Sequence, residues 1–137
     1  MAEEEIDAYM ESAQSNLETA RVLMEAERHA DAVFHSALAS EKATAALILQ
    51  LGAKPSRRHR NSAILYRIVP RELRDRVEFK EILDELMRLE PHVIEARYPV
   101  RVEGTLKTPM ERYGRKEATK AFKSATKIIS TFKGYLK

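Results

Sequence analysis

Apolar residues recur every three or four positions along most of the chain, which is the spacing of amphipathic helices. The most continuous example is the segment 28–51, in which alanines flank larger residues such as Phe34 and Ile48. Gly52 stands where a helix commonly ends, because glycine enters the left-handed conformation without steric cost. Each large apolar side chain contributes roughly 1.5–3 kcal/mol when buried, so a helix this apolar must be covered on several sides. The segment 28–51 is therefore expected to lie at the centre of the fold.

The same spacing predicts further helices, over residues 3–26, 60–68, 71–90 and 115–136. Pro91 lies inside a helical pattern, so we expect a kink there, with helical structure continuing over residues 92–96. Prolines and glycines interrupt residues 97–114, where we expect a long loop and no strand. The prediction is an all-α fold, an up-and-down four-helix bundle with an additional short helix, formed by residues 1–137 as a single domain.

Composition excludes several classes of site. The 137 residues include no cysteine, so the chain has no disulfide, thiol nucleophile or cysteine metal ligand. A carboxylate-bridged metal site in a bundle needs Glu-x-x-His pairs on two helices, and the sequence has none. We therefore expect no metal and no other cofactor. No run of about 18 apolar residues predicts a membrane span. The acidic start, MAEEEIDAYM, is the opposite of a secretory signal, so a cytoplasmic location is expected.

Charge is unevenly distributed along the chain, although the formal net charge is only +3. Residues 1–31 carry nine acidic and two basic side chains, residues 52–76 carry eight basic and two acidic ones, and residues 97–137 carry eleven basic and three acidic ones. Two basic regions of this kind favour an anionic partner. The alternative is a solvated surface rich in ion pairs.

Each basic region contains candidate ligands for phosphate or for a nucleobase. In the first, they are Arg57, Arg58 and His59. In the second, they are Arg97, Tyr98 and Arg101, where the guanidinium groups would bind phosphate and the tyrosine ring would stack on a base. The alternative for the second group is that Tyr98 simply packs the loop against the bundle.

The helical segments also resemble a known family. The segments that carry the resemblance are NLETARVLMEAERHADAVF (16–34), ALASEKATAALILQLG (37–52) and the tripeptide Arg97-Tyr98-Pro99. Together they resemble the HEPN domain (higher eukaryotes and prokaryotes nucleotide-binding) over nearly the whole chain. The resemblance implies a helical bundle that forms homodimers. It also implies, for small prokaryotic members, a minimal nucleotidyltransferase encoded alongside as the other half of a toxin–antitoxin pair.

Active HEPN proteins are metal-independent ribonucleases with an Arg and a His separated by four to six residues. Dimerisation brings two such motifs together in a basic cleft, where the Arg stabilises phosphate charge and the His acts in acid–base catalysis. Neither Arg97 nor Arg101 is followed by a histidine at that spacing. The resemblance therefore carries over only Arg97, as an anion ligand.

The sequence thus predicts a HEPN-domain protein that binds nucleotide or RNA as one component of a toxin–antitoxin-type pair with a minimal nucleotidyltransferase. One alternative is a metal-independent ribonuclease that combines Arg97 and Arg101 with a histidine from elsewhere, such as His59 or His92. The other is a non-catalytic dimeric interaction module. The expected partners are a second copy of the chain, the nucleotidyltransferase, and RNA or nucleotide.

Overall fold

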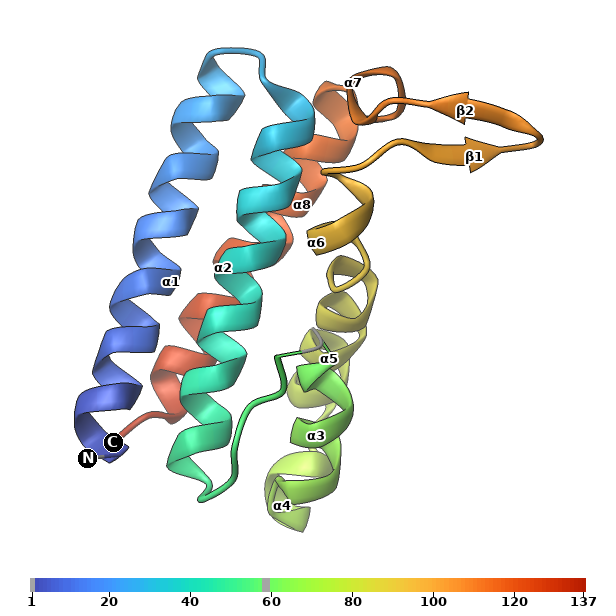
Figure 1. The fold of residues 1–137 in the computed structure, drawn as a ribbon. Helices are drawn as coiled ribbons and strands as arrows, with labels where there is room; N and C mark the ends of the chain where they lie inside the picture. Colours follow the sequence, from blue (N-terminus) through green and yellow to red (C-terminus); the bar gives the residue numbers. More distant parts are fainter. Residues whose placement is uncertain (1, 58–59) are drawn as a thin grey trace.

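Four long helices run up and down beside one another, and short helices and one hairpin connect them (Figure 1). The computed structural model describes residues 2–57 and 60–137. In chain order the elements are α1 (Ala2–Glu25), α2 (His29–Gln50), α3 (Asn61–Ile68), α4 (Arg71–Arg74), α5 (Val77–Leu89), α6 (His92–Glu95), β1 (Val100–Val102), β2 (Thr105–Lys107), α7 (Pro109–Arg112) and α8 (Arg115–Tyr135). The predicted helical bundle is confirmed.

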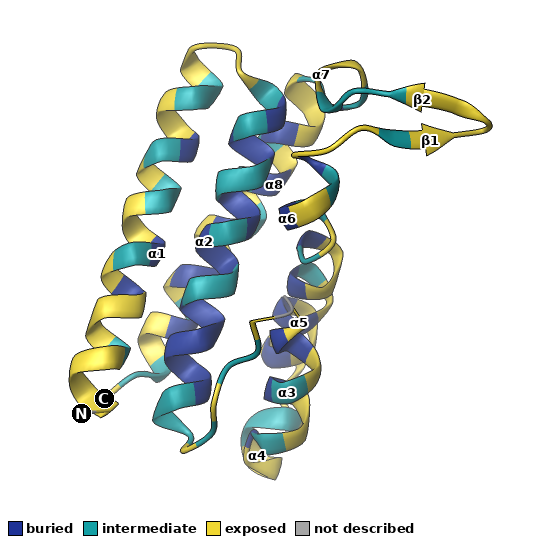
Figure 2. Ribbon diagram, viewed as in Figure 1, coloured by how far each residue is buried: buried dark blue, intermediate teal, exposed yellow. Residues whose placement is uncertain are grey.

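Helix α2 is the central element, as its alanine-rich sequence predicts. It packs against α1, α3, α5, α6, α7 and α8, and most of its length is buried (Figure 2). Its small residues allow close approach of α1 and α8, while Leu47 and Ile48 fill the core with Phe79 of α5 and Phe132 of α8.

Within the described residues, α2 and the other helices all lack the combination of length and hydrophobicity that crossing a membrane requires.

Both ends of α2 are set by residues with a positive φ. Glu27, with φ 58°, reverses the chain after α1, and the Arg28 N–H then donates to the Leu23 carbonyl at 2.8 Å. Gly52, with φ 86°, ends α2, and the Ala53 N–H donates to the Ile48 carbonyl at 3.1 Å. This is the glycine-terminated helix end that the sequence predicts.

The prediction of one continuous helix over residues 71–90 is wrong. The chain extends at Arg76 (φ −72°, ψ 135°), so the single turn α4 is separated from α5. Arg74 caps the end of α3 instead, donating to the Val69 carbonyl at 3.1 Å. The break also changes which residues face inward. Val77, in the first turn of α5, is 71% exposed, whereas Phe79 is 0% exposed and fills the core.

The prediction of no strand is also wrong, because a short antiparallel hairpin lies within residues 97–114. Strands β1 and β2 pair with Arg101 opposite Leu106, and the hairpin projects away from the bundle (Figure 1). Glu103 and Gly104 both have positive φ, at 49° and 82°, as a tight two-residue hairpin turn requires. Each strand has only three residues, which is too short for the alternation of apolar and polar residues by which strands are normally predicted.

Candidate functional site

Arg97 lies directly beyond α6, and its guanidinium group rests against two aromatic rings. Its Cζ atom is 4.8 Å from the centroid of the Phe34 ring on α2 and 5.5 Å from that of Tyr98. Each such cation–π contact is worth about 0.5–1 kcal/mol at an exposed site. None of the carboxylates in the described part of the chain pairs with Arg97. The rings therefore hold the guanidinium group while its N–H donors stay available to an anion.

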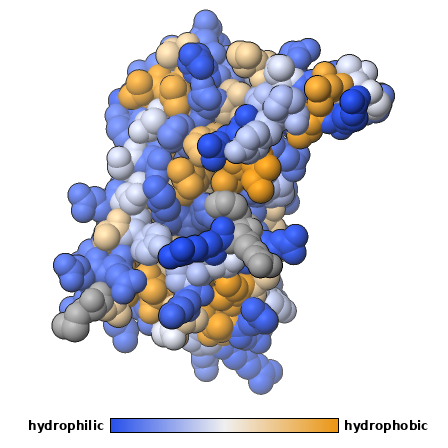
Figure 3. All heavy atoms as spheres, in the orientation of Figure 1, coloured by the Kyte–Doolittle hydropathy of each residue, from blue (hydrophilic) through white to orange (hydrophobic). Residues whose placement is uncertain are grey.

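Of the other two candidates in this region, Tyr98 shares the Arg97 surface and Arg101 does not. Tyr98 is 53% exposed, so its ring is accessible for stacking. Arg101 lies in β1, and its Nη1 atom donates to the Gly104 carbonyl at 3.1 Å. That bond ties Arg101 to the turn of the projecting hairpin. The space-filling view shows hydrophobic as well as hydrophilic residues on this hairpin (Figure 3).

A surface pocket of about 410 Å³ opens beside Arg97. Its walls include Arg28, Asp31, Phe34, His35, Arg97 and Met110. Arg28 and Asp31 form an ion pair of 2.8 Å, so they neutralise one another. Arg97 is then the cation of this pocket that keeps its charge available, and His35 is the titratable group beside it.

His35 is oriented by a chain of hydrogen bonds between α1 and α2. Lys42 donates to the amide oxygen of Asn16 at 2.7 Å, and the Asn16 amide nitrogen lies 3.2 Å from Nδ1 of His35. An ammonium group can only donate, so Asn16 must turn its oxygen to Lys42 and its NH₂ to His35. Nδ1 of His35 therefore accepts, and the neutral ring carries its proton on Nε2. Burial lowers the pKa of His35, Asp31 raises it and Lys42 lowers it further, so the neutral form is favoured.

The first basic region lies elsewhere on the molecule. Arg57 lines a separate cleft of about 490 Å³ with Glu5 and Lys42, next to the second half of α2. Arg58 and His59 lie outside the described residues. Phe34 beside Arg97 and Ala45 beside Arg57 are eleven residues apart on α2, or about 16 Å along its axis. Within one chain, Arg57 and Arg97 thus do not converge.

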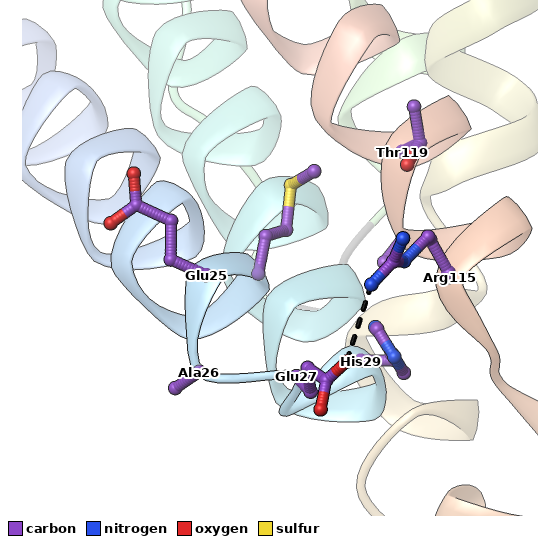
Figure 4. A pocket seen from close by; sticks show the side chains of 8 residues that line it. Glu25, Ala26, Glu27, His29, Arg115 and Thr119 are labelled. Carbon is purple, nitrogen blue, oxygen red and sulfur yellow. Dashed lines mark hydrogen bonds and ion pairs between the residues drawn. The ribbon is translucent and has the colours of Figure 1, made fainter.

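A further pocket, of about 350 Å³, lies where the α1–α2 turn meets the start of α8 (Figure 4). Arg115 of α8 pairs with Glu27 of the turn at 3.2 Å, and His29 lies beside them. The Nδ1 atom of His29 is buried with no hydrogen-bond partner among the described residues. The Arg115–Glu27 pair is exposed and is best explained as a link between α8 and the turn.

His92, one of the histidines considered for catalysis, is engaged inside the protein. Its Nδ1 atom lies 2.6 Å from the hydroxyl oxygen of Tyr113. Tyr113 is only 6% exposed, and Arg112 lies over its ring with Cζ 5.0 Å from the centroid. Burial lowers the pKa of His92, Glu95 raises it and Arg112 lowers it. Sequence reasoning did not single out Tyr113, which no motif marks and which lies 21 residues from His92.

The described residues hold no cluster of three or more His, Cys, Asp or Glu side chains that could bind a metal ion. The Arg97 surface offers a guanidinium group, two aromatic rings and an imidazole. Together these groups suit an anionic ligand that carries a planar ring.

Comparisons with known proteins identify the family and the fold. The sequence model of the HEPN domain family matches residues 6–135. A protein of Methanocaldococcus jannaschii named "Putative toxin MJ1304" is 31% identical over 133 residues, which is 94% of this chain and 86% of that protein. Two crystal structures share the fold. TT1696 from Thermus thermophilus matches with a TM-score of 0.79 at 23% identity, and ST0689, an archaeal HEPN homologue, with 0.72 at 27% identity. Each alignment covers 96% of this chain and 98% of the other.

Proposed function

Because this chain belongs to the HEPN domain family, we propose that it binds nucleotide or RNA and works as one component of a toxin–antitoxin-type pair with a minimal nucleotidyltransferase. The relative in M. jannaschii that carries a toxin name supports the class of system. We further propose that residues 1–137 act as one domain, since the described residues form one hydrophobic core that joins α1, α2, α5 and α8.

The observation that carries the proposal is the position of Arg97. Its guanidinium group is supported by Phe34 and Tyr98 and has no carboxylate partner among the described residues. A phosphate group can therefore accept from it bidentately without breaking an existing ion pair. The exposed Tyr98 ring lies close enough to stack on the attached base.

The direct test is binding of single-stranded RNA, measured by fluorescence anisotropy over a range of salt concentrations. We expect Arg97→Ala to weaken binding about tenfold or more, and the affinity of the wild type to fall steeply with salt. Arg67→Ala is the matched control, because Arg67 is an exposed arginine of α3 away from this surface. Binding that is absent at low salt, insensitive to salt, or unchanged in Arg97→Ala would contradict the proposal.

We also propose that the chain acts as a homodimer and binds its nucleotidyltransferase through the surface near Arg97. Met110, which lines the pocket beside Arg97, is 77% exposed, and Ile94 of α6 and Leu106 of the hairpin are exposed as well. A partner that covers these side chains would remove their apolar surface from water. Light scattering of the purified chain, and co-purification with the product of a neighbouring nucleotidyltransferase gene, test the two parts separately. A monomer at micromolar concentration would contradict the first.

Metal-independent RNA cleavage is a second candidate function, and one observation favours it. His35 lines the same pocket as Arg97, with its neutral ring oriented by Asn16. An arginine and a histidine from different elements would then replace the missing Arg–His motif. RNA cleavage in the presence of EDTA that disappears in both Arg97→Ala and His35→Gln would support an enzyme. Equal cleavage by wild type and variants would point to contamination. Co-purification with the nucleotidyltransferase, with no RNA cleavage and no RNA in the sample, would favour a non-catalytic interaction module.

A further inference from the structure

A further pocket, of about 330 Å³, lies between α5 and α8. Arg88 of α5 forms one wall, Lys120 of α8 forms the opposite wall, and Val33 of α2 lies at the base. His92 and Tyr113 close one end. None of these residues lines the pocket beside Arg97, so the two sites are separate.

The basic side chains that line this pocket have no partner among the described residues, whereas its two carboxylates do. Neither Arg88 nor Lys120 has a hydrogen-bond or ion-pair partner among the described residues. Glu85, in contrast, accepts a hydrogen bond from Ser124 at 3.0 Å and pairs with Lys127 at 3.2 Å. Glu117 accepts the N–H of Gly114 at 2.6 Å, which caps the start of α8. The pocket therefore presents two available cations on facing helices.

The imidazole of His92 is held in place at the end of the pocket. Its Nδ1 atom is bonded to the Tyr113 hydroxyl at 2.6 Å, and the two rings meet edge to face with centroids 5.4 Å apart. Tyr113 is fixed in turn under Arg112, which donates to the Glu95 carbonyl at 2.8 Å. One ring nitrogen of His92 is thus used internally, and the other has no partner among the described residues.

We propose that this pocket binds the terminal phosphate group of a phosphate monoester, with Arg88 and Lys120 neutralising it from opposite walls and His92 donating a hydrogen bond. A monoester carries between one and two negative charges at neutral pH and has three terminal acceptor oxygens. Arg88, Lys120 and the imidazole supply donors for those acceptors. The two positive charges exceed the one carboxylate of the lining, that of Glu117, which has no cationic partner among the described residues. A pocket of this size, at the lower end for small-molecule sites, suits one phosphoryl group with a small attached moiety.

The same phosphate chemistry occurs in a free nucleotide and at the 5′ end of an RNA, and the test separates these sources. Calorimetry at constant ionic strength compares 5′-AMP with adenosine, and a short 5′-phosphorylated RNA with its 5′-hydroxyl form. We expect each phosphorylated ligand that binds here to lose about tenfold or more in affinity without its phosphate. Tighter binding of AMP identifies a free nucleotide as a source, and tighter binding of phosphorylated RNA identifies an RNA end. No preference for phosphate in either pair would overturn the proposal.

Variants then locate the site. Arg88 and Lys120 are exposed, so Arg88→Ala and Lys120→Ala should fold normally and should each weaken the phosphate-dependent binding about tenfold. Lys123→Ala is the matched control, since Lys123 is exposed on α8 but does not line the pocket, and its affinity should stay within about twofold. Full affinity in both pocket variants would overturn the proposal.

This proposal and the RNA-binding function fail independently. Binding of 5′-AMP is also measured in the Arg97→Ala background, which removes the anion ligand of the other surface. Arg88→Ala should still weaken AMP binding about tenfold in that background, because Arg97 does not line this pocket. Loss of AMP binding in Arg97→Ala would place the phosphate on the other surface and refute the pocket. The imidazole signals in the NMR spectrum give a further readout: the one that disappears in His92→Gln should move when AMP is added to the wild type.

Discussion

Lys42 of α2 donates a hydrogen bond of 2.7 Å to the amide oxygen of Asn16 on α1. The same ammonium group also donates to Ser12 at 2.8 Å. This relationship explains two features of the sequence: the charged interruption of an apolar helix at Lys42, and the polar residues inside α1. It also determines the tautomer of His35. Because the ammonium group can only donate, Asn16 accepts with its oxygen and turns its NH₂ group toward Nδ1 of His35.

Replacing Lys42 by Met should destabilise the fold by about 1–3 kcal/mol, because the half-buried oxygens of Ser12 and Asn16 lose their donor. Urea unfolding followed by circular dichroism measures this free energy. Lys123→Met on the exposed face of α8 is the control and should change it by less than about 0.5 kcal/mol. Equal stability of the two variants would show that the network contributes nothing.

Lowering the pH should destabilise the protein through His35 and His92. Burial is the largest cause of the lowered pKa of each, so both pKa values lie below the ordinary 6.5 in the folded state. The unfolded chain then binds more protons near pH 6, and the free energy of unfolding rises with pH there. The contribution of these two histidines to the free energy of unfolding should be fully present above about pH 7. It should fall as the pH drops through 6.5 toward the pKa values of the folded state.

Urea unfolding at a series of pH values measures this dependence. The double variant His35→Gln/His92→Gln should have a flatter profile between pH 7 and about 5. A wild-type profile that is level across this range, or that rises as the pH falls, would contradict the depressed pKa values.

Truncation of Phe79 and of Val77 should have very different effects, although only one residue separates them in the chain. Phe79→Ala removes a side chain that is 0% exposed and should cost about 3–5 kcal/mol. Val77→Ala removes one that is 71% exposed and should cost less than about 0.5 kcal/mol. Thermal unfolding measures both. A larger loss of stability in Val77→Ala than in Phe79→Ala would mean that Val77, and not Phe79, faces the core.

Gly104→Ala should loosen the hairpin without unfolding the bundle. Nothing lies within 4 Å of an added Cβ atom, but the φ of 82° strains any other residue, at a cost of about 1 kcal/mol or more. Hydrogen exchange of the amide protons in β1 and β2 should accelerate, while exchange in α2 stays slow. Gly134→Ala, in a helix with open space around it, is the control and should not accelerate exchange in the hairpin.

The long helices could be predicted from sequence because their apolar periodicity is a local property. The central place of α2, its end at Gly52 and the helices flanking it all follow from spacing and from glycine chemistry. The break at Arg76 could not be predicted, since no proline or glycine marks it and the docking of Leu73 and Phe79 into the core decides it. The Glu103-Gly104 turn between two short β-branched segments was the available signal for the hairpin.

The sequence alone determined the class of fold, the family resemblance and the side chains able to bind phosphate, because these depend on residue type and on spacing within one element. Only the tertiary structure decided which of those side chains meet. It separates Arg57 from Arg97, places Phe34 under Arg97, and brings Arg88 and Lys120 to opposite walls of one pocket. These relationships join residues that stand far apart in the chain. They depend on how the helices pack around α2, which no local pattern encodes.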